Sequence, residues 1–361
     1  MKTHAVPVAI LLALSAAPAL AQTGPDFPRG KISGYIFSDW YENLAGNPAH
    51  NYDANGNDLG QANIDGKNVI TKDLNGFQIR RAYFQLDNDL SAKYATRFRL
   101  EADNKSLTSD GKDGVAVKAA YLQAKNVYPR GDFLVGIVST PMFEVWEDFW
   151  GFRAIEKTEA DFRGLAPSAD QGAELKGFVD ANHVFGYTAF VGNGAGQKPE
   201  TNRQKRTALA LPVRWKDLHV QPYVDYEAVH GGRDRATYEL FAGYDLLKGS
   251  VGWEFVDQDQ HVPAAKSVEP RGQSLFARYA YRSDLGGFLR FDYWAPDNNA
   301  GKRVDQEFWI AGIDWQPTKD VHVMPNLEAM EYRARGGAVE PAHHDLQARI
   351  TFYYKFSKPA N

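Results

Sequence analysis

Apolar and polar residues alternate along most of this chain with a period of two. The clearest case lies near the C-terminus, where Leu346, Ala348, Ile350, Phe352, Tyr354 and Phe356 alternate with Asp345, Gln347, Arg349, Thr351, Tyr353 and Lys355. Successive side chains of a β-strand point to opposite faces, whereas on a helix these residues would scatter around the cylinder. The pattern therefore predicts a strand with one apolar, aromatic face, long enough to cross a bilayer at a tilt.

The same alternation recurs upstream, for example over residues 94–101, 274–281 and 289–294. Applied to the whole chain it predicts sixteen strands, which begin near residues 31, 76, 93, 115, 132, 171, 183, 206, 218, 236, 250, 272, 287, 304, 321 and 344. An even number of strands is expected for a bacterial single-chain outer-membrane barrel. The chain is therefore predicted to be all-β.

The predicted connections come in two lengths. Short ones lie at residues 87–90, 128–132, 180–183, 283–287 and 316–320, and longer stretches rich in Asn, Asp and Gly lie at 43–73, 193–205, 257–272 and 296–303. Short turns at one end and long loops at the other are typical of outer-membrane barrels. Because every backbone polar group must be paired within hydrocarbon, strands cross a membrane only as a closed antiparallel barrel, and sixteen of them leave a channel.

The first 21 residues have the layout of a secretory signal peptide. Lys2 is followed by an apolar run over residues 5–14 and by the small-residue site Ala19-Leu20-Ala21. A transmembrane anchor is the alternative, but the run is short for a span and Pro18 interrupts its end. We expect residues 1–21 to be removed and residues 22–361 to form one barrel domain in the outer membrane.

Composition narrows the function classes. The mean hydropathy is −0.47 although 13% of residues are aromatic, a balance that suits a barrel with a polar lumen and aromatic girdles. The formal charge of −4 does not favour a nucleic-acid partner, and the absence of Cys excludes thiolate chemistry. The sequence has no G-x-S-x-G, H-E-x-x-H or P-loop pattern, so we expect a pore and not an enzyme. A barrel hydrolase or a non-conducting adhesion barrel stays open as the alternative.

Several segments resemble one family of porins. They are residues 76–86 (GFQIRRAYFQL), 135–143 (VGIVSTPMF) and 321–328 (VHVMPNLE), together with Glu156-Lys157-Thr158 and the spaced Asp170, Gly172, Leu175 and Gly177. In this order they resemble the porins that include the phosphate-selective porins O and P. The resemblance implies a homotrimer of 16-stranded barrels in the outer-membrane lipid bilayer, each with a third extracellular loop that folds inward and narrows the pore.

The connection over residues 140–170 fits that implication independently. It carries the aromatic residues Phe143, Trp146, Phe149, Trp150, Phe152 and Phe162. A loop in open water gains nothing from so much apolar surface, which packing against the inner barrel wall would bury. We interpret it as a constriction loop; packing on a neighbouring subunit or over the barrel mouth is the alternative.

Charged residues are the candidates for controlling passage, because pores select solutes with charged groups at the narrowest point. Strand parity predicts that seven side chains face the lumen: Arg81, Arg97, Arg99, Glu101, Arg278, Arg290 and Arg349. The parity near Arg81 is ambiguous, because Phe77 and Ile79 lie on the same side of the alternation. An arginine ladder that attracts anions and a set of structural ion pairs are both consistent with this pattern.

The loop itself is acidic. Residues 142–171 hold seven acids and three bases, and those before Asp170 are Glu144, Glu147, Asp148, Arg153, Glu156, Lys157, Glu159, Asp161 and Arg163. An acidic loop opposite a basic wall sets up a transverse field and predicts a general porin for small hydrophilic solutes or ions. A phosphate- or anion-selective porin, as the resemblance implies, is the alternative. Neutralising Glu156, Glu159 and Asp161 is then expected to favour anions.

Metal and cofactor signals are weak. Asp53-x-Asn55-x-Asn57 begins like a calcium loop, but Asp58 and Ile64 stand where Gly and Glu are needed. Residues 343–345 (HHD) would point to opposite faces of a strand, so we expect His343 and His344 to be loop residues. No metal and no cofactor is predicted.

Overall fold

The computed structural model describes residues 27–46, 72–229, 233–261, 265–341 and 343–360. The predicted signal peptide and the calcium-like segment lie outside these ranges. The first half of the sheet contains β1 (Arg29–Ala45), β2 (Asn75–Asp89), β3 (Tyr94–Leu107), β4 (Asp113–Tyr128), β5 (Gly131–Ser139), β6 (Ala169–Phe178), β7 (Gly186–Gly192), β8 (Arg206–Ala210) and β9 (Val213–Trp215). The second half contains β10 (Leu218–Glu227), β11 (Asp234–Leu246), β12 (Gly249–His261), β13 (Arg271–Arg282), β14 (Leu285–Ala295), β15 (Arg303–Thr318), β16 (Val321–Arg335) and β17 (Asp345–Ala360).

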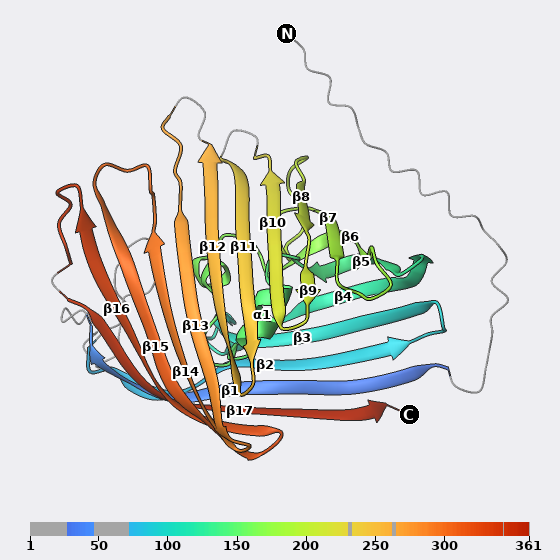
Figure 1. The fold of residues 1–361 in the computed structure, drawn as a ribbon, viewed down its shortest axis with the longest axis horizontal. Coiled ribbons are helices and arrows are strands. Elements are labelled where there is room, and N and C mark those ends of the chain that lie inside the picture. Colours follow the sequence, from blue (N-terminus) through green and yellow to red (C-terminus); the bar gives the residue numbers. More distant parts are fainter. Residues whose placement is uncertain (1–26, 47–71, 230–232, 262–264, 342, 361) are drawn as a thin grey trace, which may run out of the picture.

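These strands form one closed antiparallel barrel (Figure 1). Each strand pairs with its neighbour in sequence, and β1 also pairs with β17, from Gly30 opposite Ala360 to Ala45 opposite Leu346. β8 and β9 both pair with β10, so they are two parts of one strand interrupted at Leu211 and Pro212. The described residues therefore form sixteen barrel strands, and the predicted fold class is confirmed.

The two faces of the strands differ as the alternation predicted. Outward-facing apolar side chains are exposed, with Phe352 at 40%, Leu275 at 56% and Leu289 at 49% of their surface. Their sequence neighbours Thr351, Phe276 and Arg290 are buried on the inner face. The barrel therefore presents an apolar band outward and keeps its polar and charged side chains inside, as a barrel surrounded by lipid requires.

Every strand begins within three residues of the position that the alternation predicted. The short connections include those between β4 and β5 and between β15 and β16, and the long ones lie at the opposite end of the barrel. His343 and His344 precede β17 and are loop residues, as expected. Within the described ranges no helix has the length and apolar character needed to cross a membrane.

Candidate functional site

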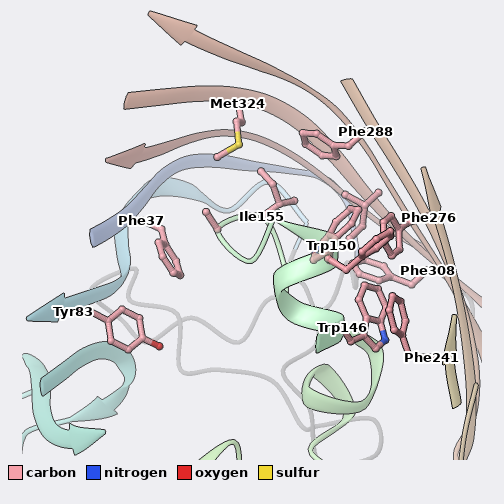
Figure 2. Close-up of a cluster of buried hydrophobic side chains, with 13 residues drawn as sticks. Phe37, Tyr83, Trp146, Trp150, Ile155, Phe241, Phe276, Phe288, Phe308 and Met324 are labelled. Carbon is pink, nitrogen blue, oxygen red and sulfur yellow. The ribbon is translucent and has the colours of Figure 1, made fainter. Parts of the chain in front are cut away.

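The connection between β5 and β6 folds into two short helices, α1 (Glu144–Trp150) and α2 (Glu159–Arg163). Trp146 and Trp150 of α1 are fully buried. The ring centroid of Trp146 lies 5.6 Å from that of Phe241 on β11 and 5.0 Å from that of Phe276 on β13. Figure 2 shows α1 directing these two tryptophans toward Phe241 and Phe276. The aromatic residues of this loop thus pack against inward-facing side chains of the barrel wall.

Ion pairs and hydrogen bonds hold α2 against the same wall. Glu159 is fully buried and lies 2.9 Å from Arg163 and 3.9 Å from Arg290 of β14. Arg290 also lies 2.6 Å from Asp292 and donates a hydrogen bond to the carbonyl oxygen of Lys157. Burial raises the pKa of Glu159 well above its usual value, against the lowering effect of Arg163. This network is structural, because its charges are buried and face one another.

The segment between the helices crosses to the opposite side of the lumen. Arg80 of β2 donates hydrogen bonds to the carbonyl oxygens of Ala154 and Ile155 and pairs with Asp39 of β1. Burial raises the pKa of Glu156, but the charges of Arg349 and Arg80 outweigh it and leave the pKa below its usual value. Arginines on β2 and β17 thus anchor the loop at its far side.

A cavity of about 370 Å³ remains between α1 and the wall formed by β1 to β4. We call it the loop cavity; the charged and tyrosine side chains that line it are Tyr35, Arg81, Tyr83, Arg97, Arg99, Lys118, Glu144, Glu147, Asp148, Arg153 and Asp161. The wall contributes four of the five bases and the loop contributes all four acids. The arrangement places opposite charges across a narrow polar space.

Most of the wall bases already have acidic partners. Arg81 lies 2.6 Å from Glu101, Lys118 lies 3.1 Å from the same carboxylate, and Arg97 lies 2.6 Å from Asp87. In the described part of the chain Arg99 has no acid within 4 Å; its Nε donates to Gln85 Oε1 over 2.6 Å. Arg99 therefore keeps an uncompensated positive charge at the cavity.

The loop acids divide into two groups. Glu144, Glu147 and Asp148 are partly or largely exposed at the loop cavity, and among the described residues Asp148 has no base within 4 Å. Burial, followed by the charges of Glu147 and Glu144, raises the pKa of Asp148. Asp161 is buried 2.9 Å from Lys157; burial raises its pKa, but Lys157 and Arg153 outweigh that effect and lower it. The first group is the one that a solute in the cavity meets.

The seven wall residues predicted from parity all point to the inner side, but they do not form one ladder. Arg81, Arg97 and Arg99 line the loop cavity, and Glu101 is buried beside them. Arg278 lines a second cavity of about 390 Å³ near the short turns, the turn-side cavity, whose lining includes Phe152, Arg282, His322, Met324 and Tyr353. The basic residues are thus divided between two spaces.

Three candidate residues lie away from the cavity. Arg290 is fully buried beneath the loop, and Arg349 is 5% exposed and paired with Glu328. Neither contacts the loop cavity, because each forms ion pairs within the wall or beneath the loop. Glu159, which the sequence placed among the constriction-loop candidates, does not face the cavity either, since its carboxylate is buried between Arg163 and Arg290.

Sequence reasoning missed several inward bases, and two of them, Arg80 and Lys118, have a common cause. Both lie at β-bulges, where the register shifts between Phe37 and Ser38 on β1 and between Arg99 and Leu100 on β3. A bulge adds one residue and reverses the parity beyond it. The bulge at Arg80 explains why Phe77 and Ile79 face outward although Arg81 faces inward. In the sequence, the break in the alternation of apolar and polar residues near Arg80 and Lys118 is the signal that could have revealed these two bases.

Among the described residues no group of three or more His, Asp or Glu side chains is arranged to hold a metal ion. His343 Nε2 lies 3.8 Å from Asp345.

The fold is similar to those of solved outer-membrane proteins. OmpT of Vibrio cholerae matches with a TM-score of 0.62 at 14% identity, over 91% of this chain and 97% of that one. An anion-selective porin from Comamonas acidovorans matches with a TM-score of 0.63 at 12% identity, over 91% and 100%. The outer-membrane channel DcaP of Acinetobacter baumannii matches with a TM-score of 0.62 at 10% identity, over 92% and 99%. No protein-family model and no curated protein matches the chain. At these identities the similarity establishes the barrel fold that this chain shares with porins.

Proposed function

We propose that this protein is an outer-membrane porin through which small hydrophilic solutes or ions diffuse passively. One observation carries the proposal: a closed sixteen-stranded barrel with an apolar outer face encloses a loop that leaves a charged cavity beside the wall. A closed barrel leaves no unpaired strand edge in hydrocarbon, and sixteen strands enclose more space than side chains alone fill. The loop would act as the constriction.

The charge distribution favours a general pore over one specific for phosphate. Glu144, Glu147 and Asp148 face the cavity from the loop, opposite Arg81, Arg97 and Arg99. Two of these arginines are paired with wall acids, which weakens their attraction for a phosphate. A phosphate-binding site would instead gather several unpaired donors around one anion. Anion selectivity through Arg99 alone stays the second candidate.

Export, location and assembly follow from the same proposal. A cleaved signal peptide over residues 1–21 would deliver the barrel to the outer membrane, where the apolar band contacts lipid. The OmpT protein of Vibrio cholerae has been solved in a trimer form, and the resemblance to phosphate-selective porins also implies a trimer. We propose a homotrimer with no catalytic activity of its own.

Planar-bilayer recording tests the proposal. Purified protein that migrates as a heat-modifiable barrel should produce stepwise, salt-dependent conductance increases, and heat-denatured protein from the same preparation should produce none. Folded barrels that insert without conducting would contradict the porin function and favour the adhesion or hydrolase alternatives.

A further inference from the structure

A row of aromatic rings connects the loop cavity with the turn-side cavity. Tyr83 of β2 lies 4.5 Å from Tyr35 of β1, Tyr35 lies 6.1 Å from Tyr353 of β17, and Tyr353 lies 5.1 Å from His322 of β16, each between ring centroids. Tyr35 lines the loop cavity, whereas Tyr353 and His322 line the turn-side cavity. Tyr35, Tyr353 and His322 are half-buried, so each keeps a surface open to solvent.

Tyr35 and Tyr353 pack against the buried aromatic cluster that contains Phe37 and Tyr83, and each keeps part of its ring exposed. That exposed ring surface is apolar and borders the loop cavity at Tyr35 and the turn-side cavity at Tyr353. A flat apolar ring that stacks on it removes water from both partners and gains dispersion contacts. The row therefore favours solutes that carry such a ring.

Arg99 adds a charge requirement at the loop-cavity end of the row. Its guanidinium carbon lies 5.5 Å from the centroid of Tyr83, and the described structure gives it no acidic partner within 4 Å. The contact with Tyr83 and the hydrogen bond to Gln85 restrain the guanidinium, and Arg99 lines the cavity, so its terminal N–H donors are available to a solute there. A carboxylate can accept two of these donors in a bidentate arrangement.

We propose that the passage favours small anions with an aromatic ring, the carboxylate on Arg99 and the ring on the exposed surfaces of Tyr35, Tyr353 and His322 in this row. This inference rests on the proposed porin function and specifies its solute class. Arg99 selects the charge at the constriction, and the rings provide successive stacking positions toward the turn-side cavity. Binding at each position is weak because both cavities are wet, so a solute passes without being trapped.

Reversal potentials in planar bilayers test the inference with benzoate, acetate and benzylammonium as probes. In water acetate diffuses faster than the bulkier benzoate, so an unselective pore gives a benzoate-to-acetate permeability ratio below one. We expect a ratio above one for the wild-type protein, and no comparable preference for benzylammonium over a small cation. A ratio below one would overturn the proposal, and an equal preference for benzylammonium would overturn the role of Arg99.

Matched variants locate the preference. Tyr353→Leu and Tyr35→Leu should lower the benzoate-to-acetate ratio by roughly threefold to tenfold, the range expected for losing one aromatic pair. Tyr354→Leu is the control, because Tyr354 adjoins Tyr353 but is 42% exposed on the outer face. An equal fall in the Tyr354 variant, or no fall in either inner variant, would overturn the aromatic row. A pore that conducts but does not prefer aromatic anions would refute only this inference. A protein that conducts no salt at all would refute the porin function as well.

Discussion

Neutralising the three loop acids at the loop cavity should raise the permeability of the pore to anions relative to cations. The perturbation is the triple variant Glu144→Gln, Glu147→Gln and Asp148→Asn, which keeps side-chain shape and removes three negative charges. Glu147 lies 3.2 Å from Arg153 and Glu144 lies 3.5 Å from Lys176, but Arg153 keeps Asp161 at 3.4 Å and Lys176 keeps Glu174 at 2.9 Å, so neither base is left without an acid. The barrel should therefore assemble as the wild-type protein does.

The size of the effect follows from the dimensions of the cavity. A volume of about 370 Å³ corresponds to a sphere of radius about 4.5 Å, which places a passing ion about 6 Å from each carboxylate. At that distance one charge contributes about 0.7 kcal/mol in a medium as polar as water, or about 2 kcal/mol for three. Screening in 0.1 M salt reduces the total to about 1 kcal/mol, which is roughly a fivefold change in permeability.

The assay is the zero-current potential across a bilayer in a gradient of potassium chloride. In dilute salt the triple variant should show a cation permeability about fivefold lower than wild type, with a similar rise for chloride. Near 1 M salt the Debye length falls to about 3 Å and the shift should drop below about twofold. The matched control is Glu159→Gln, because this acid belongs to the same loop but is fully buried between Arg163 and Arg290.

Equal potentials for the triple variant and wild type in dilute salt would refute the role of the three exposed acids. A shift of the same size in Glu159→Gln, with the loop still folded, would refute it too, since a buried charge would then act as strongly as an exposed one. A shift that persists unchanged at 1 M salt would point to a structural change in place of a field effect.

Three further outcomes are expected. Phe352→Asp places a charge on the lipid-facing side of the barrel, which costs up to about 3 kcal/mol and should lower the yield of heat-modifiable barrel. The inward-facing change Gln347→Asp should leave the yield unchanged. If Gln347→Asp lowered the yield and Phe352→Asp did not, the assigned inner and outer faces would be reversed. Trp146→Ala should reduce the free energy with which the loop packs against the barrel wall by about 3–5 kcal/mol. Trypsin should then cleave faster at Arg153 and the conductance should become noisier. Unchanged cleavage would show that Trp146 does not hold the loop in place. Because the pKa of Asp148 is raised, acidification should remove its charge at a pH above the usual carboxylate range. The permeability of cations relative to anions should then fall with the pH, and this fall should be smaller in Asp148→Asn.

The alternation of side chains alone was enough to locate the sixteen strands and to assign the outer face wherever the alternation ran unbroken. The reason is physical: residues such as Leu275, Leu289 and Phe352 must contact lipid, while their neighbours must not. A strand repeats every two residues, so each short stretch carries the whole signal. The aromatic loop was visible for a similar reason, because apolar rings in a long connection need a surface to pack on.

Only the tertiary structure decided which charges meet the cavity. In sequence, Glu159 and Asp148 are both acids of one loop, yet Glu159 is buried against Arg290 while Asp148 is exposed. Ion pairing depends on strands distant in the chain, and period-two parity carries no information about those distances. Parity also reverses at the bulges that turn Arg80 and Lys118 inward, because one inserted residue shifts every later side chain to the other face.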